Sequence, residues 1–496
     1  MSVLSYGRAL SRNAERKGET VAFIHDGKST TYAELEARAN RLARAYARLG
    51  VGEGDFVTIG LPNGLEFVES LFACWKLGAT PQPLSSRLPR HELEPILDLA
   101  SPKLIVGVKR EGNGTRRVIP AGFDASGEEA TILPDRVSRY RMAICSGGST
   151  GRPKVIVDHL PGELDPDSEF HGLGPGSSML IPGPLHHSGP LINCLTILLG
   201  GGKVVVMSHF EASEALGLIE TYRLQLAIFV PTMLLRIWKL PEDERKAFDL
   251  SSLHRVISAS ASLPNWLQRE WIDWIGPDRV WEAYGGSERI GGTIISGREW
   301  LEKPGSVGRV SEGRKLKIVD NDGRMLPAGE IGDIYFLPPG GVGSTYHYLG
   351  AEPRRLEDGW ETLGDMGHLD EDGYLFLADR RTDLIISGGS NVYPAEVEGA
   401  IEAHPGVLSC AVIGLPDEDL GALVHAIVQS TTPIDEDGLR SFLSDRLVRY
   451  KIPRSFEFVA KALKDDAGKV RRAALRAERL GRSRVVESAG GKPKES

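Results

Sequence analysis

The segment CSGGSTGRPKVI, residues 145–156, concentrates glycines and hydroxyl side chains just ahead of a lysine. Glycine lets the backbone turn tightly and approach a ligand closely. Consecutive N–H groups in such a turn form an anion-binding concavity, to which hydroxyl groups add hydrogen bonds. A surface turn would use similar residues, but the apolar segment YRMAI before it indicates a strand that delivers a binding turn. The segment therefore predicts a phosphate-binding loop that ends at Lys154.

This loop does not have the spacing of a Walker A motif. That motif requires G-x-x-x-x-G-K-[ST], whereas Lys154 follows Pro153 and precedes Val155. We therefore expect a phosphate loop of another lineage.

Length and composition indicate a soluble, cytoplasmic, multidomain enzyme. A chain of 496 residues is too long for one ordinary core, and 41% hydrophobic with 25% charged residues is typical of globular proteins. A net charge of −8 disfavours nonspecific binding to nucleic acid or anionic membranes. The most apolar run, 190–207, is too broken by glycines to span a membrane. Four scattered cysteines suggest neither a zinc site nor a disulfide framework: Cys74, Cys145, Cys194 and Cys410.

Helix and strand patterns alternate through the first 300 residues. Residues 31–50 carry a helix start signal at Thr31, apolar residues at helical spacing and a stop signal at Gly50. Strands are predicted at 55–62, 202–207, 225–231 and 254–260, and further helices at 66–79 and 212–224. Such alternation predicts a largely parallel sheet covered on both faces.

The pattern changes after about residue 305. Short strands with a hairpin turn at Asn321, Asp322 and Gly323 indicate a small β-rich subdomain. Beyond residue 390 the alternation resumes, with helices at 393–404 and 435–447 and strands at 407–414 and 423–429. We therefore predict an α/β fold with three parts: an N-terminal domain at 1–380, a small α+β C-terminal domain at 381–480 and a polar, frayed tail at 481–496.

Two further segments carry side chains suited to a nucleotide. In EAYGGSERIGG, 282–292, Tyr284 could stack on a base and Glu288 offers a hard oxygen ligand for Mg²⁺. In 363–383, Asp365 could accept hydrogen bonds from both ribose hydroxyls and Arg380 could donate to the same sugar. Each segment alone is equally compatible with a turn between strands, and for Asp370–Gly373 that interpretation is the better one.

Two more segments follow in the C-terminal part. IISGGSNVYPAEVE, 385–398, places a glycine turn before a helix that Pro394 starts. DDAGKVRRAAL, 465–475, places Lys469 after a glycine and ahead of a helix. A lone lysine is normally a solvated surface group, so Lys469 is a candidate functional residue only in combination with the other segments.

Together and in this order, the five segments resemble the ANL superfamily of adenylate-forming enzymes, which includes acyl- and aryl-CoA synthetases, peptide-synthetase adenylation domains and firefly luciferases. Within CSGGSTGRPK, residues 146–154 follow the family form [ST]-S-G-[TGS]-[TS]-G-x-P-K except at Gly147, with Cys145 at its edge, and YGGSE matches Y-G-x-[TS]-E. GDMGHLDEDGYLFLADR matches the G-D-x-G segment with its downstream [GD]-R. The resemblance extends from residue 31 to Lys469.

The resemblance implies two half-reactions that use ATP, Mg²⁺ and CoA. A carboxylate attacks the α-phosphate of ATP, and a thiol then displaces AMP from the acyl-adenylate. It assigns Glu288 to Mg²⁺, Ser287 to the α-phosphate and Lys469 to the point between the carboxylate and the α-phosphate, where a compact cation is favourable. The phosphate loop would hold the β- and γ-phosphates through Ser146, Gly147, Gly148, Ser149, Thr150, Gly151 and Lys154.

The resemblance also assigns the nucleoside site. Tyr284 would stack on adenine, with Ser260 and Ala261 of SASASLP on the other side, and Asp365 and Arg380 would fix the ribose. The family segment usually reads G-A-x-P-L-P, and this chain departs from it with Ala259 and Ser262.

For the second step the family rotates a mobile C-terminal domain. Gly388 and Gly389 would then line the pantetheine tunnel. The pivot is normally Asp or Lys, but here it is Thr382, which puts the ease of rotation in doubt. In PLHHSG, 184–189, His187 matches the aromatic gate beside the acyl pocket, with a structural core histidine as the alternative.

Three functions stay open. An acid–CoA ligase is favoured over a stand-alone adenylation enzyme that loads a carrier protein. Because only 27 residues follow Lys469, we expect any such carrier to be a separate chain. A non-catalytic nucleotide-binding homologue has little use for that lysine. The small-molecule substrate is expected to be a hydrophobic carboxylic acid, because REWLEKPGSVGRV and TYHYLG look like synthetases for fatty, aryl or steroid (bile-acid-like) acids. A homodimer is a further expectation, and glycines 285, 286, 291 and 292 indicate either a roomy pocket or close backbone packing.

Overall fold

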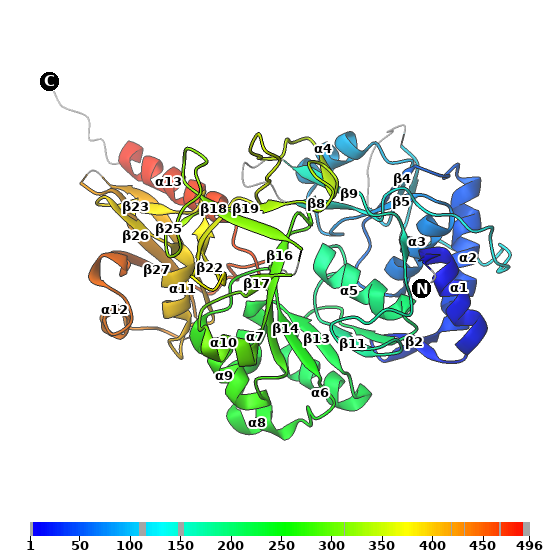
Figure 1. Cartoon of the computed structure of the whole chain (residues 1–496), viewed down its shortest axis with the longest axis horizontal. Coiled ribbons are helices and arrows are strands. Elements are labelled where there is room, and N and C mark those ends of the chain that lie inside the picture. Colours follow the sequence, from blue (N-terminus) through cyan, green and yellow to red (C-terminus); the bar gives the residue numbers. More distant parts are fainter. Residues whose placement is uncertain are drawn as a thin grey trace.

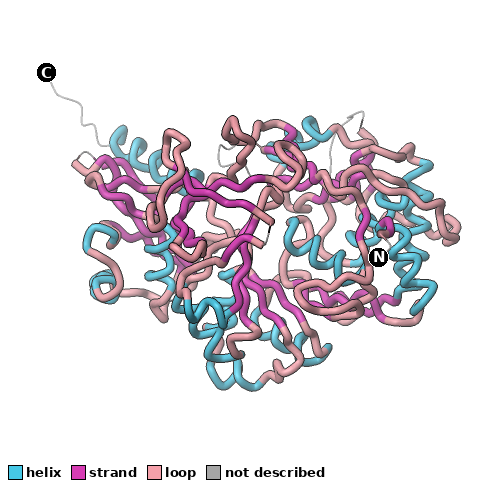
Figure 2. The backbone as a smooth tube through the Cα atoms, viewed as in Figure 1, coloured by secondary structure: helices cyan, strands magenta, loops and turns pink. Residues whose placement is uncertain are grey.

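The computed structural model describes residues 3–108, 116–146, 153–311, 313–417, 419–430, 432–465 and 468–489. The chain begins at one end of an elongated molecule and its last helix lies at the other (Figure 1). Helices enclose strands in the larger N-terminal part, and the smaller C-terminal part carries its own strands and helices (Figure 2).

A nine-stranded sheet forms the centre of the N-terminal part, in the order β17-β16-β15-β14-β13-β11-β12-β2-β3. The strands from β15 to β2 run parallel, and antiparallel strands close both edges. This confirms the predicted parallel sheet. The strands are β2 (Val21–His25), β3 (Lys28–Thr31), β11 (Ser178–Ile181), β12 (Lys203–Val206), β13 (Leu226–Phe229), β14 (Arg255–Ser258), β15 (Val280–Gly285), β16 (Gly292–Ser296) and β17 (Arg309–Val310).

Alternate residues of these strands enter two separate cores. In β12, Val204 and Val206 join one buried cluster, whereas Val205 joins the other, as the two-residue period of a strand requires. The first cluster packs α1 (Tyr6–Lys17), α2 (Tyr32–Arg48), α3 (Leu65–Lys76) and α5 (Ser188–Leu199); the second packs α6 (Ala212–Tyr222), α7 (Pro231–Trp238) and α9 (Asn265–Ile275).

The helix α2 begins where the sequence predicts it. The Thr31 hydroxyl accepts a hydrogen bond from the backbone N–H of Glu34. The Glu34 carboxylate in turn accepts a hydrogen bond from the backbone N–H of Thr31, so both hydrogen bonds of a capping box are present. At the other end, Gly50 adopts a φ of 86°, a left-handed conformation that glycine reaches without strain.

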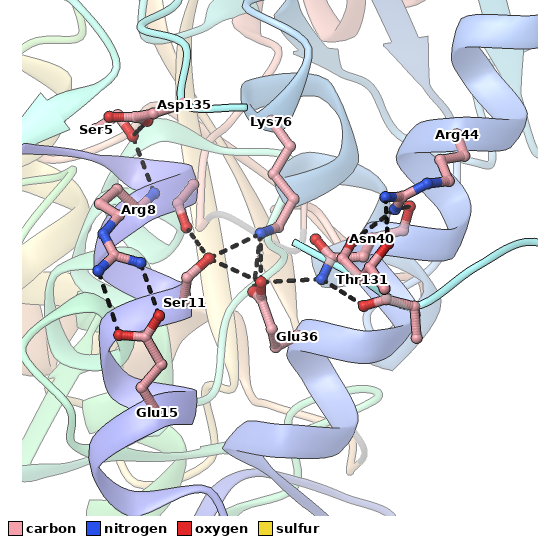
Figure 3. A network of polar contacts seen from close by, with 12 residues as sticks. Ser5, Arg8, Ser11, Glu15, Glu36, Asn40, Arg44, Lys76, Thr131 and Asp135 are labelled. Carbon is pink, nitrogen blue, oxygen red and sulfur yellow. Dashed lines mark hydrogen bonds and ion pairs between the residues drawn. The ribbon is translucent and has the colours of Figure 1, made fainter. Parts of the chain in front are cut away.

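A buried polar network ties α1, α2 and α3 together (Figure 3). Lys76 Nζ lies 2.8 Å from the Glu36 carboxylate, and Ser11 donates to the same group at 2.7 Å. Both charged side chains are less than a tenth exposed. Removing one partner would leave a buried charge uncompensated, at a cost of about 3–5 kcal/mol, so the network specifies how these helices pair.

Among the described residues, the N-terminal part contains three further sheets of three or four strands, besides a two-stranded pair of β1 (Leu4–Ser5) and β10 (Glu163–Leu164). A parallel sheet has the order β5-β4-β6-β7, a hairpin sheet has the order β20-β9-β8, and the predicted β-rich subdomain is a sheet of order β18-β19-β21-β22. The first contains β4 (Phe56–Ile59), β5 (Thr80–Pro83), β6 (Leu104–Val106) and β7 (Val118–Ile119). The others contain β8 (Ala143–Ser146), β9 (Lys154–Asp158), β20 (Tyr346–Leu349), β18 (Lys315–Val319), β19 (Gly332–Leu337), β21 (Asp365–Leu369) and β22 (Leu375–Arg380).

The C-terminal part has a separate core. Strands β25 (Ser409–Asp417), β26 (Gly421–Gln429) and β27 (Ser455–Val459) form one sheet, packed with α11 (Pro394–Glu402) and α12 (Glu436–Ser444) around buried residues such as Val412 and Val428. The last helix, α13 (Arg472–Ala489), enters the segment for which the sequence predicts a frayed tail. Among the described residues, no helix is both long and apolar enough to cross a membrane.

Candidate active site

The predicted phosphate loop connects two antiparallel strands. β8 ends at Ser146 and β9 begins at Lys154, and these two residues are paired across the hairpin. The strand predicted before the loop is therefore present, and Lys154 is fixed at the start of the strand after it. The predicted residues Gly147, Gly148, Ser149, Thr150 and Gly151 lie outside the described residues.

The structure brings Lys154 to the predicted metal ligand. Its Nζ lies 3.4 Å from Glu288 Oε1, with the lysine side chain a quarter exposed and the glutamate 12% exposed. Next to Glu288, the hydroxyl of Ser287 is 2.6 Å from that of Ser188, the first residue of α5. Three segments far apart in sequence thus meet at the carboxyl end of β15.

Tyr284, Asp365 and Arg380 form a second group. Tyr284 Oη donates to Asp365 Oδ2 at 2.9 Å, and Arg380 Nε donates to Asp365 Oδ1 at 3.3 Å. Asp365 and Arg380 are opposite each other on β21 and β22. Burial, together with the Asp365 charge, raises the pKa of Tyr284 well above its ordinary value, so its hydroxyl stays a donor.

The 258–264 segment runs beside β15. Ser260 and Ala261 are exposed, and Ser260 has a φ of 76°, uncommon for a residue other than glycine. The end of the segment is held by Glu282, whose Oε1 accepts from the Leu263 N–H at 3.1 Å. Glu282 is buried, and burial raises its pKa to about 8. Sequence reasoning missed Glu282, although it lies in the same strand as Tyr284.

His187 lies at the start of α5, half-buried, with its ring 4.5 Å from that of His186. Burial lowers its pKa to about 3, and the charges of His186 and Lys469 act in the same direction. The imidazole is therefore neutral at physiological pH. Its assignment as a gate stays a prediction.

Lys469 reaches this site from the C-terminal part. Lys469 is exposed overall, but nearby protein atoms still desolvate its ammonium and lower its pKa. The charge of Arg380 lowers the pKa further, whereas the charges of Asp465, Glu288 and Asp365 act in the opposite direction. The preceding residue, Gly468, packs so closely that a Cβ there would lie 3.1–3.2 Å from Val230 and Thr232. Lys469 is thus among the charges of the predicted nucleotide site.

Gly388 and Gly389 lie elsewhere on the same domain. They form the turn between β23 (Ile385–Ser387) and β24 (Ser390–Val392), with φ of 57° and 78°. Two consecutive positive φ angles are typical of a tight hairpin turn and favour glycine. The Gly388 N–H donates to the Leu420 carbonyl of its own domain at 2.9 Å.

Thr382 stands between two anchored residues. Arg381 donates to Asp333 at 2.6 Å and to Asn321 at 2.8 Å, both in the β-rich subdomain. Asp383 instead accepts from Arg472 of the C-terminal part at 2.8 Å. The side-chain attachments of the chain therefore change from one domain to the other across Thr382.

Two residues that sequence reasoning missed contact this site. Tyr348 Oη donates to Glu288 Oε1 at 2.7 Å, and Lys154 Nζ lies 4.0 Å from the centre of the same ring. Arg289, with a φ of 57°, donates to Asp158 of β9 at 3.0 Å. From the sequence alone, the segment TYHYLG, which contains Tyr348, indicates only the substrate class.

The glycines around YGGSERIGG are explained by close packing. A Cβ on Gly291 would lie 2.1 Å from the Phe336 ring, and one on Gly292 would lie 2.6 Å from the Tyr284 carbonyl oxygen. A Cβ on Gly286 would lie 2.8 Å from Leu363. Of the two sequence interpretations, backbone packing is therefore favoured over a roomy pocket.

Comparison with known proteins places this geometry in a family. The model for AMP-binding enzymes matches residues 10–347, and that for the C-terminal domain of AMP-binding enzymes matches residues 396–469. A feruloyl-CoA synthase of Amycolatopsis sp is 34% identical over 480 residues, which cover 94% of this chain and 97% of that protein. A fatty acid–[acyl-carrier-protein] ligase of Streptomyces coeruleorubidus is 29% identical over an alignment of 501 residues, which covers 94% of this chain and 95% of that protein.

A solved structure gives the same result for the fold. The o-succinylbenzoate CoA synthetase of Bacillus subtilis, in complex with its acyl-adenylate intermediate, aligns with a TM-score of 0.79 and 26% identity over 96% of this chain and 98% of that one. It confirms the predicted fold class, a large N-terminal α/β domain with a small C-terminal domain. The chain therefore belongs to the AMP-binding enzyme family of the ANL adenylate-forming superfamily.

Proposed function

We propose that the protein is an ATP-dependent acid–CoA ligase that first adenylates a carboxylic acid and then transfers the acyl group to CoA. The observation that carries this proposal is the convergence of Lys154, Glu288, Asp365, Arg380 and Lys469 from separate segments. A protein that only bound a nucleotide would have no need to bring Lys469 from another domain to these charges.

In the first half-reaction a carboxylate oxygen forms a bond to the α-phosphorus of ATP while the bond to the leaving pyrophosphate breaks. The chemistry depends on positioning and on neutralising negative charge. Lys154 would hold the outer phosphates, and Lys469 would supply a point charge where the carboxylate and α-phosphate meet. Tyr284, Asp365 and Arg380 would orient the nucleoside.

The residues present fit a magnesium ion held jointly with the nucleotide. Within the described part of the chain, no group of three His, Cys, Asp or Glu side chains could hold a metal. Mg²⁺ is usually bound through one or two carboxylates together with substrate phosphates, and Glu288 beside the end of the phosphate loop supplies one. When bound, the ion would neutralise charge on the phosphates.

In the second half-reaction the thiol sulfur bonds to the acyl carbon and AMP leaves. The Gly388–Gly389 hairpin would reach the cleft by rotation of the C-terminal domain about Thr382. The change in side-chain attachments between Arg381 and Asp383 supports this pivot. The domain limits at residues 380 and 480, the cytoplasmic location and the homodimer stay predictions from the sequence.

A hydrophobic acid is the proposed substrate, fatty, aryl or steroid-like. The second candidate function is transfer to a separate carrier protein, which is favoured by the similarity to the fatty acid–[acyl-carrier-protein] ligase of Streptomyces coeruleorubidus. Both candidates share the adenylation step and differ only in the thiol.

Mass spectrometry of products tests both candidates. The protein would be incubated with ATP, Mg²⁺ and a panel of aryl, fatty and steroid acids, alone, with CoA, or with a phosphopantetheinylated acyl carrier protein. An acyl-CoA product is expected. If the acyl-adenylate does not react with CoA but transfers its acyl group to the carrier protein, the second candidate is established. If no acid on the panel gives an acyl-adenylate, both candidates are contradicted.

A further inference from the structure

Tyr348 contacts both of the charged groups that would face the nucleotide, Lys154 and Glu288. It lies on β20, which pairs antiparallel with β9, so that Tyr348 is opposite Ile156 and close to Lys154 at the start of that strand. The buried Tyr346 packs against its ring at 4.8 Å in an edge-on contact. The Tyr348 ring therefore has a fixed orientation.

The distances around Glu288 show which partner controls its carboxylate. A charged N–H to carboxylate hydrogen bond is normally about 2.7–2.9 Å long, but Lys154 Nζ is 3.4 Å from Glu288 Oε1. The Tyr348 hydroxyl is 2.7 Å from the same oxygen. The closer partner of Oε1 is therefore the neutral hydroxyl.

The same ring holds the lysine. Lys154 Nζ lies 4.0 Å from the ring centre, where a cation is attracted by the negative face of the aromatic system. One side chain thus contacts both partners of the Lys154–Glu288 ion pair, the carboxylate through its hydroxyl and the ammonium through its ring.

We propose that Tyr348 is a positioning residue for magnesium–ATP: its hydroxyl orients the Glu288 carboxylate and its ring contacts the Lys154 ammonium. This inference rests on the proposed function of the same site. Hydrogen-bond partners of a metal-binding carboxylate typically contribute about 10- to 100-fold to metal affinity. The hydroxyl should therefore affect the gain in nucleotide affinity that Mg²⁺ confers.

The test is calorimetric binding of α,β-methylene ATP, an analogue that cannot release pyrophosphate, with Mg²⁺ and with EDTA. For Tyr348→Phe we expect the Mg²⁺-dependent gain in affinity to fall about tenfold relative to the unmodified protein. In a Glu288→Gln background, Tyr348→Phe should cause no further loss, because the carboxylate that the hydroxyl orients is already absent.

The chain offers a matched control in Tyr374. Its hydroxyl donates to Glu299 at 3.0 Å and Arg309 lies 4.5 Å from its ring centre, the same combination of groups in another part of the molecule. Tyr374→Phe should keep the full Mg²⁺-dependent gain.

Three results would overturn the inference: an unchanged gain in Tyr348→Phe, an equal loss in Tyr374→Phe, or equal weakening of Tyr348→Phe with and without Mg²⁺, which would indicate a structural role only. Failure of the unmodified protein to bind the analogue would overturn the proposed function as well. Normal binding by that protein with any of the three results would overturn the inference alone.

Discussion

The C-terminal domain carries two segments that the proposed chemistry needs, and the structure engages only one of them. Lys469 lies among the charges of Arg380, Glu288 and Asp365 in the N-terminal domain. The hairpin with Gly388 and Gly389 contacts Leu420 of its own domain instead. The observed arrangement therefore fits the adenylation step of the proposed function, which requires a second arrangement for the thiol.

Specific contacts hold the observed arrangement. Trp266 Nε1 donates to the Gly399 carbonyl at 3.1 Å, Arg471 lies 3.3 Å from Glu92, and Lys239 donates to the Val407 carbonyl. Polar contacts of this kind are typical of interfaces between domains of one chain. The two segments can thus be tested separately by substitution.

Lys469→Ala should have the largest effect. Loss of the cation between carboxylate and α-phosphate should slow pyrophosphate release on the order of 100- to 1,000-fold, while α,β-methylene ATP binds nearly as before. Stopped-flow pyrophosphate release and calorimetry measure the two quantities. An equal loss of nucleotide binding would contradict the role assigned to Lys469.

Gly389→Trp should block the thioester step and spare pyrophosphate release. No atom outside its chain neighbours lies within 4 Å of a Cβ at this position, so the side chain adds only the strain of its positive φ, about 1–2 kcal/mol. Acyl-CoA formation should fall below a tenth of the rate of the unmodified protein because an indole would obstruct the thiol.

Gly373→Trp is the control for that prediction. It has the same φ of about 79° and similarly open surroundings, but it lies in the β21–β22 turn. Both half-reactions should survive in this variant. If both half-reactions also survived in Gly389→Trp, the Gly388–Gly389 hairpin would have no role in the thioester step.

Lys464→Met should reduce stability and leave the chemistry intact. Lys464 Nζ is 2.5 Å from the buried Glu402 carboxylate. Burial alone would lower its pKa, but Glu402 and Glu398 reverse this, so the pKa is raised. Removing the cation leaves Glu402 uncompensated, at about 3–5 kcal/mol of unfolding free energy, measurable by denaturant titration. If the folded Lys464→Met protein lost adenylation, Lys464 would have a role in the chemistry, as proposed for Lys469, and not only in stability.

Trp266→Phe should have the smallest effect. It removes one hydrogen bond that joins the domains in the observed arrangement, worth about 1 kcal/mol, so pyrophosphate release should slow about fivefold. The thioester step from a supplied acyl-adenylate should be unchanged or faster. A slower thioester step would indicate that this contact persists in both arrangements.

The sequence predicted the regular elements well, for local reasons. Thr31 and Glu34 form a capping box that depends on neighbours in the chain, and the alternation of valines in β12 follows from strand geometry. The meeting of Lys154 with Glu288 was predictable only through the family resemblance, since no local pattern relates residues so far apart in sequence.

The missed residues depend on tertiary packing. Tyr348 becomes important because β20 pairs with β9 rather than with a neighbour in sequence, and Glu282 because the 258–264 segment returns over β15. The helix α13 continues beyond residue 480 although the sequence there is polar. The glycines at 286, 291 and 292 suggested a pocket, and only the positions of Leu363, Phe336 and the Tyr284 carbonyl reveal their packing role.

The most direct test of the two-arrangement account supplies a synthetic acyl-adenylate, made from an acid accepted by the unmodified protein, together with CoA. Lys469→Ala should convert it to acyl-CoA at close to the unmodified rate, because this lysine serves only the first half-reaction. Gly389→Trp should not convert it. Failure of Lys469→Ala, or success of Gly389→Trp, would contradict the assignment of one segment to each half-reaction.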